Sequence, residues 1–175
     1  YATAAIRMIK DHIFTAVEHG RDASARLAMA SASMMAGAAF SNSMVGIVHA
    51  IGHSLGAVCH VPHAEAMSIL LPFCMEYNLD MLSEDYGRLL LYLTDEDTYA
   101  QTPHKERAAR SIQAIRDMCS TLNRLCGLPL TLRDVNVQPE DFERVAQGAI
   151  NDGAMIVNPK QAGVADVVGI LKKAW

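Results

Sequence analysis

The chain has 175 residues, of which 51% are apolar and 19% charged, so it can build a core and lacks the composition of a disordered protein. Its formal net charge of −4 argues against a nucleic-acid surface, because phosphate binding needs a concentrated cationic face. The four cysteines form no Cys-x-x-Cys pair and no secretory leader is recognisable, which predicts a reduced, cytoplasmic protein.

The N-terminal part of the chain predicts two helices. Because the sequence starts at Tyr1 within the first of them, we expect a processed protein or a piece of a longer one. The first helix ends at Gly20 and carries an apolar stripe at spacings of three and four, formed by Ile6, Ile9, Ile13 and Val17. Asp22 is the predicted N-cap of the second helix, which runs to about Phe40, with a kink or break at 41–43.

The middle of the chain predicts two more helices. The third reaches about His60. Pro62 is placed in the first turn of the fourth, which is expected to run through Glu76 and to be bent near its end by Pro72.

The rest of the chain also reads as helical. A short helix is predicted at 85–93, followed by an acidic loop at 94–97, and a longer helix starts at Thr102 and is closed by Gly127. Residues 128–137 are irregular or briefly extended and are the only strand candidate. Helices opening at 138–140 and covering 165–174 complete the chain. The predicted fold class is therefore all-α, with one helical-bundle domain over residues 1–175.

Residues 27–64 contain no Asp, Glu, Lys or Arg. Ser, Asn, Gly and His interrupt the apolar run before it reaches the roughly 20 residues that a membrane span needs. We therefore predict two buried helices that pack closely through small residues, and no membrane partner.

Four histidines lie in this uncharged segment: His49, His53, His60 and His63. His49 and His53 are spaced to share a helix face, and a turn before His63 can fold it back beside them. Converging neutral imidazoles suit a divalent metal such as Fe²⁺ or Zn²⁺, although the spacing fits a packed, hydrogen-bonded pair equally well. A catalytic metal takes three or four protein ligands, so we expect the missing ones from another segment.

Several separated motifs resemble the iron-containing (group III) alcohol dehydrogenases. The main one covers 46–57 (GIVHAIGHSLGA) and continues through 61–63 (VPH). Shorter matches occur at 39–42 (AFSN), 69–72 (ILLP), 75–78 (MEYN), 158–159 (NP) and 174–175 (AW). The resemblance extends over the whole chain and corresponds to the C-terminal helical half of that family.

The resemblance implies a fold and a ligand set. The chain would be the C-terminal domain of a two-domain dehydroquinate synthase-like enzyme, whose N-terminal α/β domain binds NAD or NADP and is missing here. His49 and His63 would be metal ligands, completed by an Asp and a His from just before this chain. His53 would lie near the nicotinamide and relay the alcohol proton, with Phe40 as an apolar wall of the cofactor site.

The implied activity is interconversion of an alcohol with an aldehyde or ketone by NAD(P) and Fe²⁺, or Zn²⁺ in its place. The partners would be a small-molecule alcohol or aldehyde, the N-terminal domain of the same protein and a second copy in a homodimer or higher oligomer. By itself the chain is expected to be inactive.

Three positions depart from the family pattern: Ser54 replaces a usual Pro, Ala64 a frequent Gly, and 155–157 (MIV) are bulkier than usual. The last predicts a larger, more apolar substrate pocket and leaves the alcohol unidentified. Two alternatives remain. One is a related polyol dehydrogenase or maleylacetate reductase-like enzyme, and the other is a non-catalytic helical metal-binding or interaction module.

Overall fold

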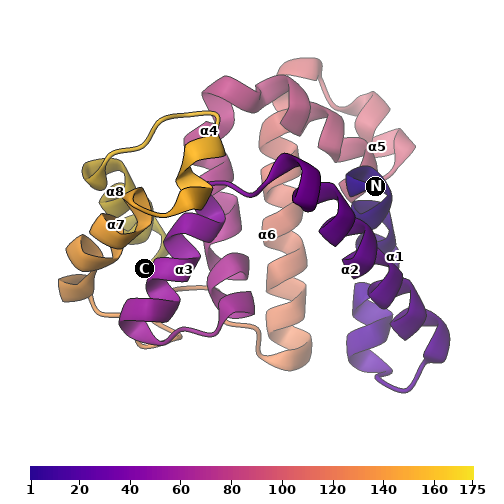
Figure 1. Cartoon of the computed structure of the whole chain (residues 1–175). Coiled ribbons are helices and arrows are strands. Elements are labelled where there is room, and N and C mark those ends of the chain that lie inside the picture. Colours follow the sequence, from indigo (N-terminus) through magenta and orange to yellow (C-terminus); the bar gives the residue numbers. More distant parts are fainter. The chain divides into compact units, whose positions relative to one another are not determined.

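The computed structural model describes all residues from 1 to 175, and every regular element in it is helical. No strand forms, and residues 128–137 are loop and turns, so the predicted all-α class is confirmed (Figure 1). The α-helices are α1 (Ala2–Glu18), α2 (Ala23–Ser43), α3 (Ile47–Cys59), α4 (His63–Leu93), α5 (Glu96–Gln101), α6 (Arg107–Cys126), α7 (Phe142–Ile150) and α8 (Val164–Ala174). The 3-10 turns are η1 (His104–Glu106), η2 (Pro139–Asp141) and η3 (Gly153–Val157).

The helices form two compact units, and α4 contributes to both. The first unit comprises Tyr1–Ser43 and Ser83–Gly127, and the second comprises Met44–Leu82 and Leu128–Trp175. Leu82, at the boundary, has non-helical dihedral angles (φ −122°, ψ 20°) that kink α4.

In the first unit, α1 packs against α2 and α6. The predicted N-cap at Asp22 is confirmed, because its carboxylate accepts a 2.8 Å hydrogen bond from the Ala25 amide at the start of α2. Gly127 ends α6 in the left-handed region, with φ 75°, which a glycine adopts without steric cost.

The main cluster of buried apolar residues lies in the second unit. It is formed by apolar residues of α3, the first part of α4, α7 and α8, with Leu132 and Val137 from the intervening loop. In this unit α3 lies against α7 and η3, and α7 against α8 (Figure 1). The four cysteines of the chain are free thiols.

Three predicted helix boundaries are wrong. The second helix continues to Ser43, because the side chains of residues 41–43 donate to carbonyls one turn earlier, and the chain turns instead at Met44 with φ 61°. The fourth helix passes Pro72 and Glu76 and includes the helix expected at 85–93. The loop expected at 94–97 ends at Asp95, which caps α5 by accepting from the Thr98 amide at 2.8 Å, and Glu96 and Asp97 form the first turn of that helix.

The predicted burial of α2 is also wrong. Only Ala25 and Ala32 are buried on this helix, whereas Leu27, Met34 and Phe40 are 69%, 71% and 51% exposed. The small uncharged residues of α2 permit close packing against another helix. However, α2 packs against α1 on one side only, and its other side stays exposed. No single helix has the length and hydropathy of a membrane span. Only α2 and α3 taken together have that length and hydropathy, and a bend separates them.

Candidate functional site

Three of the four histidines singled out by the sequence meet in the second unit. The ring centroids of His49 and His53 are 5.7 Å apart, those of His49 and His63 are 5.5 Å apart, and those of His53 and His63 are 5.7 Å apart. The predicted convergence of His63 on the other two is therefore confirmed.

The turn between α3 and α4 produces this convergence. His49 and His53 share one face of α3, one helical turn apart. His60 ends α3 in the left-handed conformation, with φ 58°, and Pro62 then offers its carbonyl to the Ala66 amide at 3.0 Å to start α4. The chain thus reverses within a few residues and brings His63 back to His49 and His53.

The histidines are less buried than the sequence indicates. His49 is half-buried, whereas His53, His60 and His63 are exposed. They lie at the surface of the unit and not within its core. Ser54, by contrast, is buried in a continuous α3, so this departure from the family pattern leaves the helix intact.

Asp152 completes the cluster and was missed by sequence reasoning. Its carboxylate lies 2.9 Å from Nδ1 of His53, and its other oxygen accepts a 2.7 Å hydrogen bond from the Ala154 amide at the start of η3. The available sequence signal was Asp before Gly at the end of a helix, which predicts a cap but not a histidine partner.

Electrostatics favour neutral His49 and ionised Asp152. Burial lowers the pKa of His49, and the neighbouring His63 and His53 lower it further, against a smaller opposing effect of Asp152. Burial acts to raise the pKa of Asp152, but hydrogen bonds from the Ala154 amide and from His53 outweigh it and hold that pKa below its usual value.

The donors present fit part of a metal site. Neutral imidazole nitrogens bind divalent metals at about 2 Å, and rings as close as those of His49 and His63 can share one ion. No three His, Cys, Asp or Glu side chains of the chain are arranged to hold a metal ion by themselves. The fit of this chain's own donors to a metal ion is therefore partial.

The sequence also predicted Phe40 at the cofactor site and residues 155–157 at a substrate pocket. Phe40 belongs to the first unit, near the end of α2, and its role at a cofactor stays a prediction. Met155 and Ile156, expected at a substrate pocket, line an open pocket of about 410 Å³ beside η3, together with Asn158 and Pro159.

Comparison with known proteins identifies a family. All residues from 1 to 175 match the model described as "Fe-containing alcohol dehydrogenase family, C-terminal". Alcohol dehydrogenase 4 of Saccharomyces cerevisiae is 32% identical over 99% of this chain, and 1,3-propanediol dehydrogenase of Klebsiella pneumoniae is 34% identical over 99%. The resemblance deduced from the motifs is confirmed.

A solved structure agrees with this comparison. A 1,3-propanediol oxidoreductase matches 99% of this chain with a TM-score of 0.90 and 33% identity. The chain spans 43% of the length of both curated relatives and 44% of the solved structure. The match is thus to the C-terminal helical part of longer proteins.

Proposed function

The chain belongs to the Fe-containing alcohol dehydrogenase family, and from this premise we propose that it forms the helical half of an oxidoreductase. That enzyme would interconvert an alcohol with an aldehyde or ketone, using NAD or NADP and a divalent metal. The convergence of His49, His53 and His63 beside Asp152 carries the proposal, because it supplies metal donors and a proton acceptor together.

We assign His49 and His63 as the metal ligands contributed by this chain. Metal binding requires unprotonated imidazole, and the lowered pKa of His49 keeps it available near neutral pH. When bound, a divalent metal supplies Lewis acidity toward the alcohol oxygen, and NAD(P) supplies the hydride acceptor.

His53 is assigned to proton transfer. An ionised carboxylate can only accept hydrogen bonds, so the Asp152 contact requires that Nδ1 of neutral His53 carries the proton. Nε2 is then left with a free lone pair that can take the hydroxyl proton of an alcohol. Because His53 is 44% exposed at its side chain, it can pass that proton to solvent.

The test uses the full-length protein with His49→Ala and His63→Ala. We expect each change to remove the bound metal and to lower alcohol oxidation by about 10³-fold or more, since Lewis acidity supplies several kcal/mol. Metal content by atomic emission and steady-state rates measure both effects. The matched control is His60→Asn, in which Asn tolerates the left-handed position that His60 occupies at the end of α3.

The control variant should keep its metal and its activity. Full activity in both His49→Ala and His63→Ala would contradict the proposal. Absence of alcohol oxidation from the wild-type full-length protein, in contrast, would favour the alternative of a non-catalytic helical module.

A further inference from the structure

Asn158 lies at the end of η3 and reaches the first residue of α3. Its Oδ1 accepts a 3.2 Å hydrogen bond from the Ile47 amide. The first amides of a helix have no partner within the helix, and Gly46 at the N-cap has no side chain to offer one. Asn158 therefore replaces the missing cap from a distant part of the chain.

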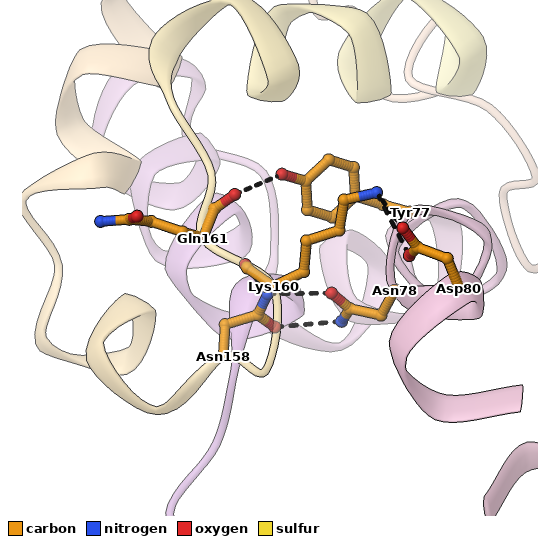
Figure 2. A network of polar contacts seen from close by, with 6 residues as sticks. All are labelled: Tyr77, Asn78, Asp80, Asn158, Lys160 and Gln161. Atoms are coloured by element: carbon orange, nitrogen blue, oxygen red, sulfur yellow. Dashed lines mark hydrogen bonds and ion pairs between the residues drawn. The ribbon is translucent and has the colours of Figure 1, made fainter. Parts of the chain in front are cut away.

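Asn78, in the part of α4 that belongs to the second unit, holds Asn158 in this position. The two carboxamides are reciprocally bonded: Asn78 Nδ2 donates to Asn158 Oδ1 at 3.0 Å, and Asn158 Nδ2 donates to Asn78 Oδ1 at 2.9 Å (Figure 2). Asn158 Nδ2 also donates to the Lys160 carbonyl at 2.7 Å, so every donor and acceptor site of its amide is used. Asn78 is only 5% exposed, which shields the pair from competing water.

The approach of Asn158 also explains the glycine at position 46. A Cβ on Gly46 would lie 2.9 Å from Asn158 Oδ1, which is shorter than the non-bonded contacts that Cβ atoms make in proteins. The absence of a side chain at Gly46 is thus what lets Asn158 act as the cap.

The pair joins the three elements that carry the histidine cluster. Ile47 opens α3, which carries His49 in its first turn and His53 in the next. Asn78 lies on α4, which begins at His63, and Asn158 ends the turn that Asp152 begins. A shift at this junction would move the elements bearing His49 and His63 relative to each other.

We propose that the Asn78–Asn158 pair is a positioning device that sets the relative placement of His49, His53 and His63 by anchoring the first turn of α3. The pair touches none of the reacting groups. It acts through the first turn of α3. The proposal rests on the proposed function only in the experiment that measures metal binding.

Neighbouring contacts of the same loop provide a control. The Tyr77 hydroxyl donates to the Gln161 carbonyl at 2.7 Å, and Lys160 Nζ lies 3.0 Å from an Asp80 carboxylate oxygen (Figure 2). These contacts join the loop to α4 but do not include α3. Tyr77→Phe therefore loosens the loop and leaves the cap on Ile47 in place.

The experiment compares Asn158→Ala, Asn158→Asp and Tyr77→Phe in the full-length protein. Zn²⁺ is the probe, and its affinity is measured by competition with a chelating dye. Asn158→Ala should weaken Zn²⁺ binding about 10–100-fold, the usual effect of losing a residue that orients ligands. Asn158→Asp keeps an oxygen for the Ile47 amide but loses the amide hydrogens given to Asn78 and Lys160, so it should recover only part of the affinity. Tyr77→Phe should stay within about twofold of wild type.

A second measurement needs no metal. In the metal-free protein, the ring resonances of His49 and His53 in carbon–proton NMR spectra should move in Asn158→Ala and stay in place in Tyr77→Phe. If wild type binds no Zn²⁺, the proposed function fails, and these resonances alone decide the role of the pair.

Two results would overturn the proposal. One is an Asn158→Ala protein that folds with wild-type Zn²⁺ affinity and unmoved resonances. The other is a loss of Zn²⁺ affinity in Tyr77→Phe that equals the loss in Asn158→Ala when the two variants have the same free energy of unfolding. Should Asn158→Ala not fold, Asn78→Ala decides, because it keeps the Ile47 contact but frees Asn158, and it should weaken Zn²⁺ binding severalfold.

Discussion

The imidazole of His53 meets the carboxylate of Asp152 at 2.9 Å, and this contact selects which ring nitrogen carries the proton. A neutral imidazole has one donor and one acceptor nitrogen, so an acceptor at Nδ1 leaves Nε2 as the basic site. The side chain of Asp152 is 24% exposed, and its bond to the Ala154 amide holds it in place while it faces the ring. In the proposed function, Asp152 is therefore a positioning residue that acts through His53.

Asp152→Asn tests this role in the full-length protein. Asn still caps the Ala154 amide, but its carboxamide can present either oxygen or NH₂ to His53, so the tautomer preference is lost. We expect kcat to fall about 10–100-fold at unchanged metal content, and the side-chain nitrogen NMR shifts of His53 to indicate mixed tautomers. An unchanged rate together with an unchanged tautomer would remove Asp152 from the site.

At the scale of elements, the close contact of α3 with α7 sets the position of Asp152, which follows the end of α7. Ser54 on α3 is buried and its hydroxyl donates to the Val145 carbonyl on α7 at 2.7 Å. Gly148 on α7 faces the same hydroxyl, and a Cβ there would collide with Ser54 Oγ. The residue that departs from the family pattern at position 54 thus packs against a glycine.

Gly148→Ala should destabilise the chain by about 1–3 kcal/mol, because an added methyl overpacks this contact. Ser54→Ala alone should cost about 0.5–1.5 kcal/mol through the lost hydrogen bond. The double variant should be more stable than the sum predicts, since removing the hydroxyl makes room for the new methyl. Urea unfolding of the four proteins measures the coupling, and strictly additive losses would rule out this contact as the cause.

At the scale of the whole molecule, the exposed apolar side of α2 is the largest departure from expectation. Leu27 and Met34 lie two turns apart on the same face of the helix, and Phe40 is also half exposed near its end. Exposed apolar patches on soluble proteins mark surfaces that contact other groups. Within 27–43 only Ala32 is buried, so this uncharged composition lies mainly at the surface of the chain.

This exposure predicts binding of the hydrophobic dye ANS by the folded 175-residue chain. Leu27→Ser with Met34→Ser should lower the dye fluorescence, while each surface change alters stability by no more than about 0.5 kcal/mol. Met81→Ser, at an exposed methionine of α4, is the control and should have a smaller effect. Equal fluorescence in wild type and the double variant, with equal melting temperatures, would contradict the exposed patch.

The sequence by itself determined what depends on neighbours along the chain. The apolar stripe of α1, the Asp22 cap and the Gly127 terminus follow from helical spacing and backbone preference, which act over a few residues. The pairing of His49 with His53 is local in the same sense. The motifs also sufficed to identify the family, because they are distributed over the whole chain.

Only the tertiary structure decided the pairs that lie far apart in sequence. Nothing local to Asp152 indicates His53, and nothing local to Asn158 indicates Ile47 or Asn78. The prediction that α2 is buried was wrong for the same reason. The composition of a helix determines which surfaces it can pack against, but the rest of the fold determines whether such a surface lies beside it. Such pairs form when packing of α3, α4 and α7 overcomes the entropy of closing long loops, and no short-range preference encodes that balance.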